Sequence, residues 1–317
     1  MVKCVICNKE FEQEKQLHAH LKAHKMRMAE YYQTYFPRKD LYSGELIKFK
    51  SKDYYMTTDF NSRLNMKKWL SSVPKNEAKA YVQKIFKDRI ERKGSELVPT
   101  QVELRTVSSP PVQYYQELFG DYHKFCVDLG LRKRYESYPS ERSFSINDYS
   151  KTKDLKIYVD TREQYPFKLD FPSESKGLKF GDYALSDGEI CCNCHIERKS
   201  IKDFIGTFSG GLERFRREID RSVEAEAYLV VLVESTISKC MAFDKLPYVS
   251  KKIQATPEYI FRNVRDIYRD YDNIQFLFVD GRKEAVRVMK KIFFCGCAYY
   301  DYDLQLAYDL KVLWGDI

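Results

Sequence analysis

His195-Ile196-Glu197-Arg198-Lys199, near the middle of this 317-residue chain, has the pattern of a buried β-strand with charged residues at its end. Side chains alternate between the two faces of a strand, so Glu197 and Lys199 are predicted to share one face and Arg198 to lie on the other. A carboxylate and an ammonium group on one face suit metal-assisted hydrolysis of a phosphodiester. The acid can hold Mg²⁺, and the lysine can orient or activate the attacking water.

Further acids stand where they could join this pair. They lie in three stretches: Asp160-Thr161-Arg162-Glu163 after a predicted strand, Gly181-Asp182 before another strand, and Asp203 on the next predicted helix. A single acid at a strand end is usually a solvated charge or a helix cap, but the full order is harder to attribute to chance. Mg²⁺ takes oxygen ligands and keeps waters, so two or three of these carboxylates and a phosphate would complete its shell.

This order of residues resembles the nuclease domain of the XPF family of structure-specific endonucleases. That family belongs to the PD-(D/E)xK, or restriction-endonuclease-like, superfamily. The resemblance covers residues 155–300, and its central motif is Gly-Asp…Glu-Arg-Lys-x-x-x-Asp, which runs from Gly181 to Asp203 without substitution. The chain ends at Ile317, so we expect none of the tandem helix-hairpin-helix motifs of eukaryotic members, which leaves dimerisation and a preference for branched DNA open.

The resemblance also implies roles for individual residues. Asp160, Asp182 and Glu197 would ligate the metal, and Lys199 would stand at the nucleophilic water. The residues that would line or brace the site are Arg162, Glu163, Arg198 and Asp203. Cleavage would leave a 5′-phosphate and a 3′-hydroxyl.

The N-terminus carries a second motif, with the spacing C-x2-C-x3-F-x5-L-x2-H-x3-H from Cys4 to His24. Cys4 and Cys7 are expected on a tight hairpin, and His20 and His24 lie one helical turn apart on one face. The motif resembles the two-cysteine, two-histidine zinc finger, which implies a ββα fold and one structural Zn²⁺. Metal binding supplies about 10–16 kcal/mol to such a module, which is too small to fold on apolar burial alone.

The DNA contacts of this finger stay open at the level of sequence. Its base-reading positions fall near residues 12–17, which contain glutamines that suit adenine and glutamates that repel phosphate. Sequence-specific reading and a docking role are both consistent with this composition. His18 is out of register with the metal ligands and is expected in solvent.

Residues 28–135 are predicted to form a basic, aromatic and helical region that targets DNA. Aromatic and basic residues are dense between positions 31 and 69, where the aromatics either stack on bases or pack at the edge of a core. The segment 119–131 is similar to a single homing-endonuclease-associated repeat, a small helical DNA-binding unit. The cations after it, Arg132, Lys133 and Arg134, either contact the DNA backbone or form a solvated helix end.

The C-terminal half alternates between short apolar runs and amphipathic segments. Strands are predicted at 155–159, 183–185, 194–197, 228–234 and 274–279, and helices at 201–208, 212–226, 258–271 and 282–294. This order predicts an α/β fold with a restriction-endonuclease-like mixed sheet flanked by helices. The expected domains are a zinc finger at 1–27, the targeting region at 28–135, a linker at 136–154 and the nuclease domain at 155–317.

The predicted helix at 212–226 is rich in arginine. Arg214 and Arg217 are candidate contacts to DNA phosphates, and Arg216 and Arg221 lie on the same helix. These cations could instead pair with the acids of that helix, which are Glu213, Glu218 and Asp220.

Charge is distributed unevenly along the chain. Residues 1–153 hold 29 Lys and Arg against 19 Asp and Glu, and the remainder holds 25 against 27. We therefore expect anion binding in the first part and acidic metal ligation in the second, although a generally lysine-rich surface would give the same counts. No segment resembles a signal peptide, and the apolar runs are too short to span a membrane.

Nine cysteines, an odd number, favour a reducing intracellular compartment over a disulfide framework. That compartment would be a cytoplasm, a nucleoid or the nucleus of a host cell. The residues that invite a second zinc site are Cys191, Cys192, Cys194, His195, Cys295 and Cys297. Their C-x-C spacing is tight, and a strand would send Cys194 and His195 to opposite faces, so buried free thiols are the favoured interpretation.

These features predict a DNA endonuclease that depends on Mg²⁺ or Mn²⁺ and is structure-specific or associated with a mobile element or phage. The alternative is a DNA-binding scaffold protein with an inert nuclease-like core, against which the intact acids and lysine argue. An RNA substrate and a homodimer are left open, because a basic surface attracts either polyanion.

Overall fold

The computed structural model describes residues 1–94, 96–107, 109–136, 138–144, 154–250, 253–296 and 298–314. Contacts divide the chain into two compact units, residues 1–85 with 108–110, and residues 86–107 with 111–317. These units differ from the expected domains, which end at 27 and 135, so the functional boundaries stay a prediction. Part of the expected linker, at 137 and 145–153, lies outside the described residues.

The first unit joins the predicted zinc finger to the helices that follow it. Its elements are β1 (Val2–Lys3), β2 (Glu10–Phe11), α1 (Glu14–His20), η1 (Leu21–His24), α2 (Met28–Tyr35), α3 (Lys52–Thr57), α4 (Arg63–Ser72) and the first half of α5 (Lys75–Lys93). The strands β1 and β2 pair antiparallel ahead of α1. This is the ββα arrangement that the spacing predicts.

A single small core holds the finger and the next helices together. Its buried side chains are Cys4, Leu17, Leu21, Tyr31, Tyr32, Ile47 and Tyr55. The Tyr31 hydroxyl accepts a hydrogen bond from the Val5 backbone at 3.1 Å, and the Tyr32 hydroxyl lies 3.0 Å from Nε2 of His18. His18 is therefore half-buried rather than solvated, because α2 packs beside the finger helix.

The aromatic residues of the first unit fall into two classes. Tyr31, Tyr32 and Tyr55 are core residues, so they are not available to stack on bases. Tyr35 and Tyr42 are more than 40% exposed and remain accessible. Core packing is therefore confirmed for Tyr31, Tyr32 and Tyr55, and stacking on bases stays a prediction for Tyr35 and Tyr42.

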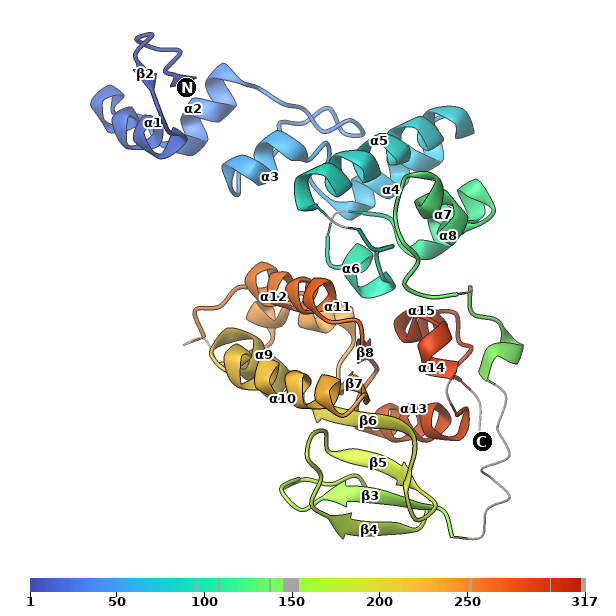
Figure 1. Ribbon diagram of the computed structural model, residues 1–317. Helices are drawn as coiled ribbons and strands as arrows, with labels where there is room; N and C mark the ends of the chain where they lie inside the picture. Colours follow the sequence, from blue (N-terminus) through green and yellow to red (C-terminus); the bar gives the residue numbers. More distant parts are fainter. Residues whose placement is uncertain are drawn as a thin grey trace. The chain divides into compact units, whose positions relative to one another are not determined.

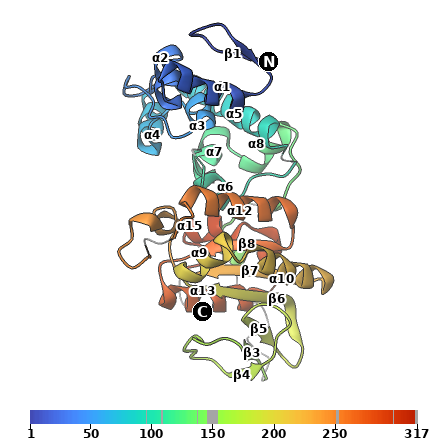
Figure 2. The same ribbon diagram turned by 90° about the vertical axis from the view of Figure 1, so that its left-hand side faces the viewer.

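The second unit is built on a six-stranded mixed sheet in the order β4-β3-β5-β6-β7-β8, which both views show (Figures 1 and 2). Its strands are β3 (Lys156–Asp160), β4 (Ser173–Lys176), β5 (Tyr183–Ser186), β6 (Ile190–Lys199), β7 (Tyr228–Val233) and β8 (Ile274–Phe278). The β3–β5 and β5–β6 pairs are antiparallel, and the β6–β7 and β7–β8 pairs are parallel. The edge strand β4 was not predicted, because its sequence is polar and all four residues are exposed.

Helices cover both faces of this sheet, as predicted (Figure 1). One face carries α9 (Ile201–Ser209), α10 (Leu212–Glu224) and α12 (Pro257–Asp270), and the other carries α13 (Arg282–Phe294), α14 (Ala298–Asp301) and α15 (Leu304–Asp309). The fully buried strand β7 serves both layers. Val231 and Val233 face the α9–α10–α12 layer, whereas Val230 and Leu232 face the α13–α15 layer.

Short elements complete the described part of this unit. They are α6 (Gln101–Arg105), α7 (Val112–Phe119), α8 (Tyr122–Asp128), η2 (Glu141–Phe144), α11 (Ile237–Cys240) and η4 (Phe243–Lys245). Gly120, with φ of +84°, ends α7, and the Asp121 side chain caps α8, which accounts for the Phe-Gly-Asp pattern in the repeat-like segment. None of the described helices is both long and apolar enough to cross a membrane.

Polar contacts attach α6 to α15, one of the helices that cover the sheet. The Gln101 backbone N–H donates to Asp303 Oδ2 at 2.6 Å, and Arg105 pairs with Asp309 at 2.7 Å. Asp303 also caps α15 by accepting from Leu306 N–H at 3.0 Å. Full burial raises the pKa of Asp303 to about 6, although these two N–H groups oppose the shift.

This buried carboxyl group predicts a pH dependence of stability. Its folded pKa of about 6 lies above the unfolded value, so the folded chain binds the proton more tightly and stability falls as pH rises from about 4 through 6. Between pH 4.5 and 7.5 the contribution of Asp303 should fall by about 2 kcal/mol. Urea unfolding of wild type and Asp303→Asn at both pH values isolates it. The exposed neighbour Asp301, changed to Asn, should leave the pH dependence unaltered.

Candidate active site and metal cluster

The strand β6 places Glu197 and Lys199 on one face, as the alternation predicts. Glu197 pairs in register with Val231 and Lys199 with Val233, so both charged side chains point to the α9–α10–α12 layer. The Lys199 ammonium donates to Glu197 Oε1 at 2.7 Å, and both side chains are at most 10% exposed. The sheet therefore buries an ion pair at the end of a central strand.

Asp182 reaches this pair from the turn that opens β5. Its Oδ2 accepts the backbone N–H of Arg198 at 2.7 Å, and its own backbone N–H donates to Ile196 at 2.8 Å. Burial, reinforced by the nearby Glu197 charge, raises the pKa of Asp182 to about 8. Burial also raises the pKa of Glu197, while the acids around Lys199 outweigh its desolvation and raise the pKa of that ammonium group.

Asp160, at the end of β3, has a carboxylate that is held by donors from two nearby segments. Its carboxylate accepts hydrogen bonds from the Arg162 backbone, from the Arg162 guanidinium at 2.8 and 2.9 Å, and from Leu178 N–H at 2.8 Å. Burial opposes ionisation here, but these donors hold the pKa of Asp160 below its usual value. Asp160, Asp182 and Glu197 form no cluster of mutually close ligand oxygens among the described residues. The role of Asp160 as a metal ligand stays a prediction.

Arg198 points to the opposite face of β6, as predicted, and enters a separate charge network. Its guanidinium donates to both carboxylate oxygens of Glu163, at 3.0 and 3.1 Å, and to Glu234 at 3.3 Å. Arg282 pairs with the same Glu234 at 2.7 Å. Glu163 and Arg198 therefore tie the end of β3 to β6 and β7 rather than facing Lys199.

The remaining motif residues lie at the rim. Asp203 accepts the Ser200 hydroxyl at 2.6 Å, and its backbone N–H donates back to that hydroxyl, so it belongs to the cap of α9. The Arg162 side chain is 65% exposed even though it holds Asp160. This leaves part of its guanidinium accessible from solvent.

One acid at the site was missed by sequence reasoning, which considered Glu218 only as a partner for arginines on its own helix. Glu218 Oε1 accepts the backbone N–H of Gly181 at 3.1 Å, and its charge adds to burial in raising the pKa of Glu197. The sequence signal was its place beside the buried Phe215 and Ile219 on α10. That position identifies Glu218 as a residue of the site only once α10 is known to cover the end of β6.

The predicted DNA contacts differ in accessibility. Arg214 and Arg217 are exposed, as are Arg132 and Lys133. Arg134 is buried, donates to the Tyr268 carbonyl and lies over the Tyr268 ring at 5.4 Å. These contacts are structural, and the DNA contact of Arg134 stays a prediction.

Two other arginines of α10 also have structural partners. Arg216 pairs with Asp270 of α12 at 2.9 Å, and Arg221 donates to the Lys179 carbonyl at 3.2 Å. Neither uses the acids of its own helix that the sequence offered as partners. They are therefore weaker candidates for phosphate contacts than Arg214 and Arg217.

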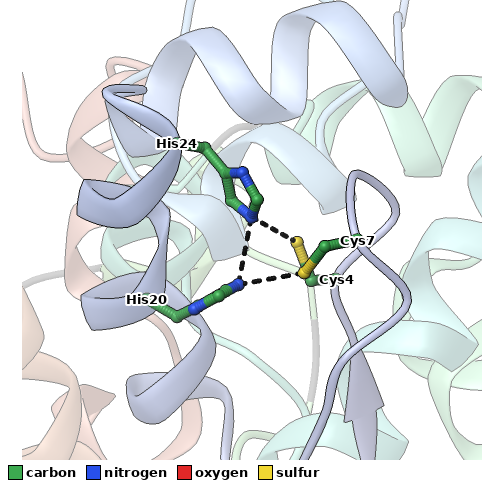
Figure 3. Close-up of side chains that lie close together, drawn as sticks. All are labelled: Cys4, Cys7, His20 and His24. Atoms are coloured by element: carbon green, nitrogen blue, oxygen red, sulfur yellow. Dashed lines mark hydrogen bonds between the residues drawn. The ribbon is translucent and has the colours of Figure 1, made fainter.

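The N-terminal Cys and His residues converge, as Figure 3 shows. The ligand atoms of Cys4, Cys7, His20 and His24 all lie within 4.8 Å of one another. Cys4 Sγ lies 3.6 Å from His24 Nε2, and Cys7 Sγ lies 3.2 Å from His20 Nε2. Two sulfur and two imidazole donors in this geometry suit a tetrahedral metal ion.

The other cysteines form no comparable group in the described part of the chain. Cys191, Cys194 and Cys295 are buried. Cys194 packs in the α13–α15 layer, whereas the His195 ring contacts Phe180 at 4.4 Å. Cys297 and the side chain of Cys192 lie outside the described residues.

The comparison with known families bears on the second unit. Residues 159–292 match the model of the ERCC4 domain family. This ERCC4 match contains every motif residue from Asp160 to Asp203 and supports the resemblance to the XPF nuclease domain. No curated protein sequence matches the chain.

Two solved structures are similar to part of the chain. XPF from Aeropyrum pernix in complex with DNA is 21% identical, with a TM-score of 0.33, and the match covers 43% of this chain and 62% of that one. XPF from Aeropyrum pernix alone is 19% identical, with a TM-score of 0.33, covering 44% and 63%. This chain thus spans less than two thirds of either protein.

Substituting Gly181 tests how tightly the turn that carries Asp182 is packed. Gly181 has φ of +68°, and an added Cβ would lie 3.0 Å from His195 Cβ and 3.3 Å from the Ile196 carbonyl. Gly181→Ala should therefore lower the free energy of unfolding by about 1–3 kcal/mol in urea titrations. Gly206→Ala is the control, because open space surrounds that helical glycine, and it should stabilise by about 0.5–1 kcal/mol. Equal stability of both variants would contradict the close packing at Gly181.

Proposed function

We propose that this chain is an endonuclease that hydrolyses DNA phosphodiester bonds with the help of a divalent cation, Mg²⁺ or Mn²⁺. The observation that carries the proposal is the buried Glu197–Lys199 pair at 2.7 Å, with Asp182 beside it, inside the ERCC4 match. Buried acids that resist ionisation are common at catalytic sites, because catalysis needs groups whose pKa values are shifted by their surroundings.

The donor set at this site fits a hard cation. Asp182 and Glu197 supply carboxylate oxygens, and burial beside Glu197 raises the pKa of Asp182 to about 8. Two carboxylates that disfavour each other's charge are stabilised together when a divalent cation sits between them. When bound, such an ion polarises the scissile phosphate and lowers the pKa of a coordinated water. Asp182 and Glu197 are the residues that would hold it.

The chain's own residues then have distinct tasks. The Lys199 ammonium, fixed by Glu197, would orient the water for in-line attack on phosphorus. Arg198 would act from the other face by holding Asp182 through its backbone N–H. Arg162 at the rim and the exposed Arg214 and Arg217 of α10 would contact phosphates next to the scissile bond. The products would carry a 5′-phosphate and a 3′-hydroxyl.

The first unit would deliver the DNA. Residues 1–85 hold 17 Lys and Arg against 9 Asp and Glu, so this unit carries the entire +8 charge of the chain and the remaining residues balance to zero. A cationic unit attracts polyanions at long range and raises association rates. Of its exposed aromatic residues, Tyr35 and Tyr42 are suited to stack on unpaired bases.

The same unit is proposed to bind one structural Zn²⁺ through Cys4, Cys7, His20 and His24. In the register of the finger, Glu14 faces inward, where it pairs with Lys52 of α3. Gln13 and Gln16 are exposed at the start of α1, where Gln16 Oε1 accepts the Gln13 backbone N–H at 3.1 Å. The finger could thus dock to α3 and still present amide groups that suit adenine.

An inert DNA-binding scaffold is the competing function, and cleavage separates the two. Purified wild type should nick one or more of nicked, forked, flapped and plain duplexes in Mg²⁺, and Glu197→Gln should be slower by at least about 100-fold. Glu213→Gln, an exposed acid on α10, is the matched control and should cut normally. If wild type binds these DNAs and cuts none of them, the scaffold function holds. Single-stranded RNA in the same panel decides the substrate class.

Metal loss should unfold more than the finger itself. His20→Gln should abolish the binding of one Zn²⁺ per chain, measured by atomic absorption. It should also reduce hydrogen-exchange protection in both α1 and α2, because Leu17 and Leu21 share a core with Tyr31 and Tyr32. His18→Gln is the control on the same helix and should keep the zinc. Full zinc content in His20→Gln would rule out the proposed ligand set.

A further inference from the structure

The loop that follows β3 presents an exposed aromatic ring. Tyr165 is 70% exposed, more than any other aromatic residue that the structure describes. Exposed apolar side chains are common on protein surfaces, so the surroundings of Tyr165 decide what its ring can do. Those surroundings fix the backbone of the loop and leave the ring to solvent.

The backbone at Tyr165 is held from both sides. Its N–H donates to Glu163 Oε1 at 2.7 Å, and its carbonyl accepts a hydrogen bond from the Arg282 guanidinium. Pro166 follows and restricts the backbone of the residue before it to extended conformations. The Pro166 carbonyl also accepts from Arg282, at 2.8 Å, and the next residue, Phe167, is buried in the core. The loop is therefore already ordered around an exposed ring.

Two chains of contacts link this loop to the charged end of β6. Glu163 accepts hydrogen bonds from the Arg198 guanidinium at 3.0 and 3.1 Å. Arg282 pairs with Glu234 at 2.7 Å, and the Glu234 backbone N–H donates to the Lys199 carbonyl at 2.9 Å. The loop is thus fixed to the strand end that carries Lys199, which gives the exposed ring a set place relative to the proposed catalytic residues.

A fixed, exposed ring beside such a site is suited to a nucleobase. Stacking on an aromatic side chain strengthens binding of a single strand by about five-fold or more for each base. A loop that is ordered before binding loses less conformational entropy when a ligand arrives. Arg162, three residues before Tyr165, has a side chain that is 65% exposed. One loop therefore offers a guanidinium group for a phosphate and a ring for a base.

We propose that Tyr165 is a substrate-binding residue whose ring stacks on a nucleobase next to the cleaved phosphodiester. This inference rests on the proposed nuclease function. Stacking uses the face of a base, so that base has to separate from one of its neighbours in the strand when it is bound. Because every base has such a face, the contact is expected to tolerate any of the four bases.

DNA binding tests this role independently of the rate of cleavage. The cleaved bond is first mapped with wild type in Mg²⁺. Binding of full-length, zinc-loaded protein is then measured by fluorescence anisotropy without Mg²⁺ or Mn²⁺. On intact DNA, Tyr165→Ala should weaken binding by at least about five-fold. Tyr165→Phe should bind as wild type does, because it keeps the ring.

Abasic DNA identifies the base that stacks. Each nucleotide near the cleaved bond is replaced in turn by an abasic site. At the stacking position this change should weaken binding by wild type and leave binding by Tyr165→Ala unaltered, because ring and base form one shared interaction. Tyr248→Ala, which changes an exposed tyrosine of another loop, is the control and should respond to the abasic site as wild type does. Additive losses at every nucleotide tested would overturn the proposal.

Thermal melting separates substrate binding from a structural role. Tyr165→Ala should melt as wild type does, because its ring is mostly exposed in the folded chain. A structural tyrosine would lower the melting temperature on mutation and weaken binding to intact and abasic DNA equally. That pair of results would also overturn the proposal.

The outcomes for the two proposals are distinguishable. Wild type that binds and cuts DNA, with additive losses throughout the abasic series, removes the role of Tyr165 alone. Wild type that cuts no DNA removes the proposed function, and with it this inference about a base beside the cleaved bond.

Discussion

The buried ion pair between Glu197 and Lys199 is the constraint on which the rest of the second unit depends. Removing two charges from water is costly, and their mutual attraction offsets that cost only with good geometry and further hydrogen bonds. Here the pair lies at the end of a central strand, with Asp182 and Glu218 close by. The surroundings of the pair therefore contain more carboxyl groups than ammonium groups, which packing of a core does not require.

The sheet supplies the rigidity that such a site requires. The strand β6 is paired antiparallel to β5 and parallel to β7, so both neighbours fix the positions of its charged end. On the opposite face, Arg198 links Glu163 and Glu234, and Arg282 braces Glu234 in turn. The motif residues thus divide between the two faces of the sheet. One face carries the proposed catalytic residues, and the other carries residues that link the ends of the strands. Positioning on strands and helices is more accurate than positioning on loops.

Charge separates the two units as clearly as the fold does. The whole excess of positive charge lies in residues 1–85, and the residues that contain the acidic site are balanced overall. An acidic site by itself repels a polyanion such as the proposed DNA substrate, and a separate cationic unit would offset that repulsion. The N-terminal ββα segment shares a core with α2 and α3 in this unit.

The sequence by itself determined the α/β class, five of the six strands of the main sheet, the ββα finger and the shared face of Glu197 and Lys199. These are local properties, since period-two and period-3.6 patterns and ligand spacing act over a few residues. It missed β4, an exposed polar edge strand with no apolar pattern to reveal it. Only the tertiary structure decided that the Arg134 side chain is buried against Tyr268 and that Glu218 accepts the Gly181 N–H. Those contacts join residues from separate elements, and their partners are set by how helices pack on the sheet, which no single stretch of sequence encodes.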